Sequence, residues 1–188
     1  MILASASPRR QSLLADLVPS FAVEPAGIDE SLPPGIKAEA AVVRLARAKA
    51  EAVAQRHPGR PVLAADTLVE ANDGAILGQP TDESEAIASM RRLSSGEHRV
   101  WTGWCLIDAD GRVQHGREAT VIRLDPPPGL LEAYVAQGTW QGRAGGYDIE
   151  DALLAPHLLL VEGTRENAMG LPIGTLAPLL ASLGPVRP

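Results

Sequence analysis

Apolar segments of strand length alternate with amphipathic helical segments along this chain, and this alternation restricts the fold more than any other feature. Residues 1–4 and 61–65 are short apolar runs that are typical of buried strands. Residues 38–56 lie between them and are rich in alanine, with Val42, Leu45 and Val53 on one helical face. Because helices that alternate with strands cover the faces of a sheet, we predict an α/β fold with a mixed twisted sheet and flanking helices.

The rest of the chain continues this pattern. Ser7 and Pro8 form a typical helix start for residues 9–17, because serine caps the first N–H groups and proline needs no donor there. The strand at 61–65 is expected to end at Asp66 and Thr67. We also predict a hairpin-like turn at 70–77, strands at 100–107 and 116–124, irregular structure at 21–34 and 141–150, and helices at 81–93 (capped by Thr81), 129–136 and 172–183 (broken or bent near Pro178).

Length and charge restrict the classes of function. The chain has 188 residues and is 45% hydrophobic, which fits a single domain over residues 1–188. Its formal net charge of -6 argues against a nucleic-acid duplex as partner, because phosphate neutralisation needs clustered lysine and arginine. The single cysteine, Cys105, cannot form an internal disulfide, and we find no signal-like segment and no apolar run of transmembrane length. We therefore expect a cytoplasmic protein with no nucleic-acid or membrane partner.

The first motif is the serine-rich turn LASASPRR. A helix N-terminus with hydroxyl groups favours phosphate binding, and Arg9 and Arg10 can add bidentate contacts to an anion. The same stretch also fits simple helix capping by Ser7 with two solvated arginines. The stretch alone leaves both interpretations open.

Three acidic residues and one lysine are further candidates. Asp66 follows an apolar strand, and ligands gather at the carboxyl ends of strands in open α/β sheets. Asp29 and Glu30 could supply oxygen ligands to Mg²⁺, which is bound by few carboxylates together with phosphate and water. Lys49 could reach a phosphate. The alternatives are a turn aspartate, a solvated acidic loop and a surface lysine. The four histidines show no metal-ligand spacing and are interpreted as structural or solvated.

Several motifs occur together in one order. They are LASASPRRQSLL, IDESLP, LARAKA, AADTLV, ILGQP, LSSGEHRVWTG, GRAGGYDIE and NAMGLPI. With these motifs the sequence resembles, from end to end, the Maf family of nucleoside triphosphate pyrophosphatases. The resemblance implies two lobes around a deep nucleotide-binding cleft, as in inosine triphosphate pyrophosphatase, and a divalent metal cation, Mg²⁺ or Mn²⁺. It also implies cleavage between the α and β phosphates of a nucleoside triphosphate, and a possible homodimer.

The resemblance also assigns roles to residues. Asp66 would be the catalytic proton acceptor and, with Glu30, a metal ligand. The triphosphate would be bound by Ser7, Arg9, Arg10 and Lys49. Arg9 and Thr67 match the members that prefer dTTP and UTP, so we expect these or modified nucleotides as substrates.

Two substrate-binding positions depart from the family pattern. Glu150 stands where the dTTP/UTP members have glutamine, and it resembles the members that act on 7-methyl-GTP, although their tryptophan in the first motif is missing here. Gln79 replaces the usual lysine of LGKP, which removes a positive charge that Arg143 or Arg91 could restore. This loss keeps open a second hypothesis: a nucleotide-binding regulator of cell division with weakened catalysis.

Overall fold

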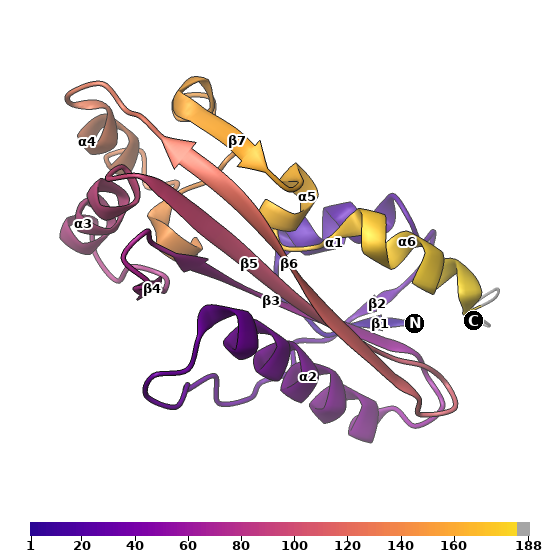
Figure 1. Cartoon of the computed structure of the whole chain (residues 1–188). Coiled ribbons are helices and arrows are strands. Elements are labelled where there is room, and N and C mark those ends of the chain that lie inside the picture. The colour runs from indigo at the N-terminus through magenta and orange to yellow at the C-terminus, as the bar shows by residue number, and fades with distance from the viewer. Residues whose placement is uncertain (184–188) are drawn as a thin grey trace. The chain divides into compact units, whose positions relative to one another are not determined.

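The computed structural model describes residues 1–183, whose helices and strands are drawn in Figure 1. The chain divides into two compact units. The first contains Met1–Asp66, Thr102–Glu118 and the segment that begins at Met169, and the second contains Thr67–Trp101 and Ala119–Ala168. The single domain over residues 1–188 and the nucleotide-binding cleft stay predictions.

The sheet is mixed, as predicted. Its strands are, in chain order, β1 (Ile2–Leu3), β2 (Ala22–Val23), β3 (Val62–Glu70), β4 (Ile76–Leu77), β5 (Glu97–Ile107), β6 (Val113–Leu124) and β7 (Leu158–Glu162). Their order in the sheet is β2-β1-β3-β5-β6-β7, with β4 paired to β3. β1 is parallel to β2 and β3, whereas the pairs β3–β4 and β6–β7 are antiparallel.

Helices flank the sheet. They are α1 (Pro8–Ala15), α2 (Ala38–Arg56), α3 (Glu83–Leu93), α4 (Leu130–Val135), α5 (Arg165–Ala168) and α6 (Ile173–Ser182), together with the short 3₁₀ turns η1 (Ala144–Gly146) and η2 (Ala155–His157). The α/β class is therefore confirmed. Within residues 1–183, none of the helices combines the length and the apolar character that crossing a bilayer requires.

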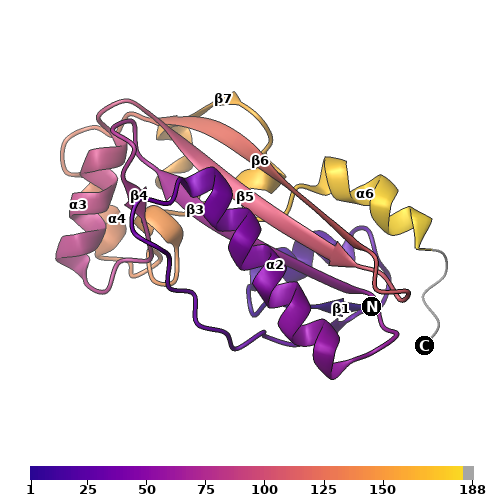
Figure 2. The same ribbon diagram turned by 60° about the horizontal axis from the view of Figure 1, so that its bottom comes forward.

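The first unit has a core on each face of its strands. Alternate side chains of β1, β3 and β5 enter different clusters, because successive residues of a strand point to opposite faces. Leu3, Leu63 and Leu106 pack with α1 and α6. Ile2 and Val62 pack on the other face with α2. Figure 2 shows α2 lying along this part of the sheet, so the unit is a helix–sheet–helix sandwich.

Four sequence-based expectations about element boundaries are wrong. β3 does not end at Asp66 but continues to Glu70, because Val69 and Glu70 pair with β4. Part of the segment 21–34 is a short strand, since the N–H of Ala22 donates to the carbonyl of Met1 at 3.0 Å. Such short pairings leave little trace in a sequence.

The other two corrections concern helices, one at its N-terminus and one in its interior. Asp82, and not Thr81, caps α3, because its carboxylate accepts from the N–H of Glu85 at 2.8 Å and is favoured by the helix dipole. α6 continues through Pro178, so the expected break is absent, whereas the alternative of a bend stays a prediction. The carbonyl that this proline leaves without an N–H partner belongs to Gly174, which is exposed to water.

The close packing of α2 on β5 depends on Gly103. A Cβ atom at this position would lie 2.3 Å from the backbone carbonyl carbon of Val42. A backbone atom in the middle of a helix cannot move aside as a flexible side chain can, so a side chain at this position would push α2 away from the strand.

We therefore expect Gly103→Ala to lower the free energy of unfolding by about 3 kcal/mol, the upper part of the usual range for overpacking a core. Gly174→Ala is the matched control. Its Cβ would meet nothing within 4 Å, and alanine is favoured over glycine in a helix by about 1 kcal/mol. Urea denaturation of the wild type and both variants measures the free energies of unfolding. If Gly103→Ala is as stable as Gly174→Ala, α2 and β5 are not in close contact at Gly103.

Candidate active site

A buried lysine bridges two carboxylates in the first unit. The ammonium Nζ of Lys49 lies 2.6 Å from Oδ1 of Asp66 and 2.8 Å from Oε2 of Glu30. Lys49 is only 8% exposed and Asp66 only 6%. The interpretation of Lys49 as a surface residue, which the sequence alone allowed, is therefore wrong. So is the interpretation of Glu30 as a residue of a merely solvated loop.

The periodicities of α2 and β3 explain why these side chains meet. Val62 and Ala64 point toward α2, and Asp66 is the next residue of β3 in the same alternation. On α2, Lys49 belongs to the buried stripe that also carries Ala46 and Val53. The charged pair is thus placed at one end of a layer that is otherwise apolar.

The surroundings of Asp66 act on its carboxyl group in opposite directions. Burial raises the pKa of Asp66, whereas the charge and the hydrogen bond of Lys49, and then the charge of Arg10, lower it. The net direction is upward. A carboxylate in such a place is a better proton acceptor than one in water.

Asp29 does not share in this cluster. Its carboxylate accepts from the N–H and the hydroxyl of Ser31, both at 2.9 Å, and so closes its own turn. The hydrogen bond from the Ser31 backbone lowers the pKa of Asp29. Of the acidic pair, Glu30 is therefore the one that reaches Lys49.

The serine-rich turn binds Arg10 firmly. Nη1 of Arg10 donates to Oγ of Ser5 at 3.2 Å, and its Nε donates to the carbonyl of Gly170 at 2.9 Å. Ser7 caps α1, as predicted, and its hydroxyl accepts from the N–H of Arg10. Arg10 thus connects the first motif to NAMGLPI, and the interpretation as a solvated arginine is wrong for it.

Electrostatics joins the two halves of this cluster. Burial lowers the pKa of Arg10, the charges of Asp66 and Glu30 raise it, and the charge of Arg9 lowers it. All of these groups are therefore close enough to interact. The first unit thus brings together six of the predicted site residues: Ser7, Arg9, Arg10, Glu30, Lys49 and Asp66.

The donor set of this cluster fits a metal only in part. Residues 1–183 contain no group of three or more His, Cys, Asp or Glu side chains that could hold an ion by themselves. Glu30 and Asp66 offer two carboxylates that already face one cation. Mg²⁺ is commonly held by one or two carboxylates and completes its shell with phosphate and water. Two carboxylates are therefore compatible with a divalent ion only if phosphate and water supply its other ligands.

The remaining predicted residues, Thr67, Gln79 and Glu150, belong to the second unit. There, the carbonyl of Gly78 accepts from the N–H of Gly145 at 2.9 Å, which brings ILGQP and GRAGGYDIE side by side. The side chains of Gln79 and Glu150 are both exposed.

The two arginines that could replace the charge missing at Gln79 already have partners. Arg143 lies 2.9 Å from a carboxylate oxygen of Asp148, and Arg91 lies 2.7 Å from one of Glu132. Asp148 was not among the residues singled out from the sequence, although it lies within GRAGGYDIE. Each of the two arginines therefore already faces a carboxylate.

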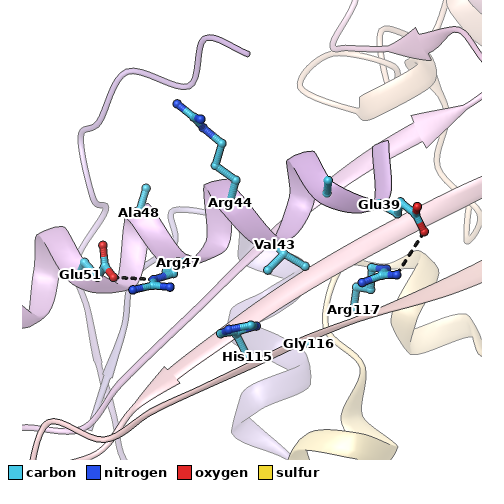
Figure 3. Close-up of a pocket in the computed structure, with 10 residues that line it drawn as sticks. Glu39, Val43, Arg44, Arg47, Ala48, Glu51, His115, Gly116 and Arg117 are labelled. Carbon is cyan, nitrogen blue, oxygen red and sulfur yellow. Dashed lines mark hydrogen bonds and ion pairs between the residues drawn. The ribbon is translucent and has the colours of Figure 1, made fainter. Parts of the chain in front are cut away.

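A separate hollow lies in the first unit beside α2. It has a volume of about 800 Å³ and is lined by α2 and by residues 115–117 of β6. Figure 3 shows its two ion pairs, Arg47 with Glu51 and Arg117 with Glu39. None of the predicted site residues lines it. Because most of its charges are paired within it, we do not assign the triphosphate to this hollow.

The second unit contains a buried histidine next to the glycine-rich loop. Nε2 of His98 lies 2.7 Å from the hydroxyl of Tyr147, and the two rings meet edge to face. His98 is 1% exposed. Its burial lowers its pKa from 6.5 to about 4. The structural role that the sequence suggested for a histidine therefore fits His98.

Because the folded protein holds His98 neutral, the unfolded chain takes up a proton first as the pH falls. We expect the free energy of unfolding to drop between pH 6.5 and about 4, by up to roughly 3 kcal/mol from this group. His98→Phe should remove this part of the pH dependence, whereas the exposed His115→Gln should keep it. Urea denaturation across this pH range measures both, and an unchanged pH dependence in His98→Phe would show that His98 is not held neutral.

Comparisons with known proteins identify the fold and the family of the chain. The structure of the Staphylococcus aureus Ham1 protein has the same fold, with a TM-score of 0.57 at 12% identity over 96% of this chain and 97% of that chain. The family model described as Maf-like protein matches residues 1–183, so the chain belongs to the Maf family.

Two curated relatives carry the name dTTP/UTP pyrophosphatase. That of Salinibacter ruber is 41% identical over 94% of this chain and 87% of its own length. That of Myxococcus xanthus is 43% identical over 98% of this chain and 92% of its own length. The similarity thus extends over nearly the whole of each protein.

Proposed function

We propose that the protein is a nucleoside triphosphate pyrophosphatase. It hydrolyses the bond between the α and β phosphates and releases a nucleoside monophosphate and pyrophosphate. The full-length similarity to proteins named dTTP/UTP pyrophosphatase supports this activity. The single structural observation that carries it is the contact of the buried Lys49 with the buried Asp66 and the exposed Glu30, beside the serine-capped helix.

Residues of the first unit take different roles in this reaction. Asp66 accepts the proton of the attacking water, since its raised pKa improves a carboxylate as a base. Arg10, Lys49 and the N-terminus of α1, capped by Ser7, stabilise the charge of the phosphates. Arg9 adds a second guanidinium beside Arg10.

Glu30 and Asp66 are the residues that would hold a divalent cation, Mg²⁺ or Mn²⁺. When bound, such an ion supplies charge neutralisation at the phosphates and makes a water molecule more acidic. The two carboxylates come from different elements, Glu30 from the loop before α2 and Asp66 from β3.

We propose dTTP and UTP as the preferred substrates. The names of the relatives support this choice, as do Arg9 and Thr67. Glu150 argues for a broader range, because an ionised glutamate only accepts hydrogen bonds whereas glutamine also donates them. Modified nucleotides whose base edge is richer in donors are therefore included in the proposal.

A regulator of cell division with weakened catalysis is the second candidate. Gln79 favours it, since Arg143 and Arg91, which could restore the missing charge, each already pair with a carboxylate. The cluster of the first unit argues against it. Nucleotide binding without turnover of any nucleoside triphosphate would favour the regulator.

We expect Asp66→Asn to lower kcat for pyrophosphate release by about 10³-fold, within the range for loss of a general base. The variant should still bind nucleotide, because the arginines and Lys49 are unchanged. Pyrophosphate release from each nucleoside triphosphate with Mg²⁺ or Mn²⁺, together with nucleotide binding by calorimetry, gives both quantities. Asp110→Asn, in an exposed turn, is the control. Retained turnover in Asp66→Asn would rule out its role as the base.

We expect Gln79→Lys to raise kcat/KM at least about fivefold, because one added charge near a phosphate contributes roughly 1 kcal/mol or more. Gln137→Lys adds the same charge at another exposed position of the second unit and should have no effect. Steady-state kinetics at low ionic strength tests the difference. If Gln79→Lys matches the wild type in turnover and in nucleotide affinity, Gln79 does not weaken the site.

A further inference from the structure

The ammonium group of Lys49 contacts two carboxylates at once, whereas a structural ion pair needs only one. It donates at 2.8 Å to Glu30 and at 2.6 Å to Asp66, the two carboxylates that we propose as metal ligands. One positive group therefore already stands where both carboxylates point. We propose that Lys49 is a substitute cation, which occupies the place of the divalent ion in the nucleotide-free protein. When the metal binds, it displaces the ammonium group toward the triphosphate. This proposal rests on the proposed function.

The distances show why the two cations exclude each other. A Mg²⁺ ion lies about 2.0–2.1 Å from its ligand oxygens. An ion at that distance from the oxygens that Lys49 contacts would lie within about 5 Å of Nζ, and repulsion between a charge of +2 and a charge of +1 at such a distance is strong in a buried place. Occupation of the site by one cation therefore requires the other to leave.

Burial explains why the protein keeps a cation in this place. The side chain of Asp66 is 8% exposed and that of Lys49 is 11% exposed, so an ionised Asp66 without a partner would be strongly unfavourable. The ammonium stabilises the carboxylate until a metal ion arrives. The side chain of Glu30 is 55% exposed, which gives an incoming ion access to the pair from its side.

The chemistry of lysine suits displacement. Its charge sits at the end of four flexible carbons and can turn to a new partner, which the planar fork of arginine does less freely. Away from Glu30 and Asp66, the ammonium needs another anion. A phosphate group of the nucleotide provides one, so metal and nucleotide should each raise the affinity of the protein for the other.

The test measures Mn²⁺ binding without turnover, from the electron paramagnetic resonance signal of the free ion. In the absence of nucleotide, we expect Lys49→Gln to bind Mn²⁺ at least about tenfold more tightly than the wild type, because no ammonium competes for the carboxylates. Lys49→Arg keeps the charge and should remain weak. Lys37→Gln removes a charge at an exposed position just before α2 and should match the wild type.

A non-hydrolysable nucleoside triphosphate analogue adds the second arm. It should raise the Mn²⁺ affinity of the wild type at least about fivefold more than that of Lys49→Gln, because only the wild type regains a partner for its ammonium. Equal or weaker Mn²⁺ binding by Lys49→Gln would overturn the proposal. Pyrophosphate release by the wild type would then still support the enzymatic activity, so the two failures can be told apart.

A third measurement is made on the wild type, and a variant serves only to assign the signal. The ¹⁵N signal of the Lys49 ammonium, identified by its absence in Lys49→Arg, should shift when Mg²⁺ and the nucleotide analogue are added together. An unshifted signal with both ligands bound would show that Lys49 stays between its carboxylates, and this too would overturn the proposal.

Discussion

The contact of the buried Lys49 with Asp66 and Glu30 is the interaction on which the arrangement of the first unit depends. A buried carboxylate without a partner costs several kcal/mol, so α2 must lie where its lysine reaches Asp66. The packing of α2 provides this, because Gly103 lets the helix backbone approach β5 and small alanines fill the layer between them. The same contact gives a carboxylate with a raised pKa next to a serine-capped helix and a held arginine, which is the chemistry that a triphosphate requires.

Strong local patterns made much of the fold predictable. The helix predicted over residues 38–56 has those bounds in the structure, because its apolar stripe is long and regular. Ser7 caps α1 as expected. What the sequence does not reveal comes from pairing between distant segments. β2 has only two residues, and β3 continues beyond Asp66 because β4 pairs with it. Such hydrogen bonds depend on which strands become neighbours and not on the composition of either one.

The residues of the candidate site could be predicted from the sequence, but most of their contacts could not. Motifs that resemble a family named Asp66, Glu30 and Lys49, although each residue alone favoured a bland interpretation. The alternation Val62, Ala64, Asp66 could have placed the aspartate on the α2 face, since that reasoning needs only the period of a strand. By contrast, no local pattern predicts that Arg10 donates to Gly170, which is 160 residues away in the chain. The partners of Arg143 and Arg91 were equally hidden, and they bear directly on whether Gln79 weakens the protein.

The most direct measurement of the activity is ³¹P nuclear magnetic resonance of dTTP incubated with the wild-type protein and Mg²⁺ or Mn²⁺. Cleavage between the α and β phosphates gives the signals of dTMP and pyrophosphate in equal amounts, and this is the expected result. Signals of dTDP and inorganic phosphate would place the cleavage at the γ phosphate, and an unchanged spectrum with dTTP and with the other nucleoside triphosphates would contradict the proposed activity.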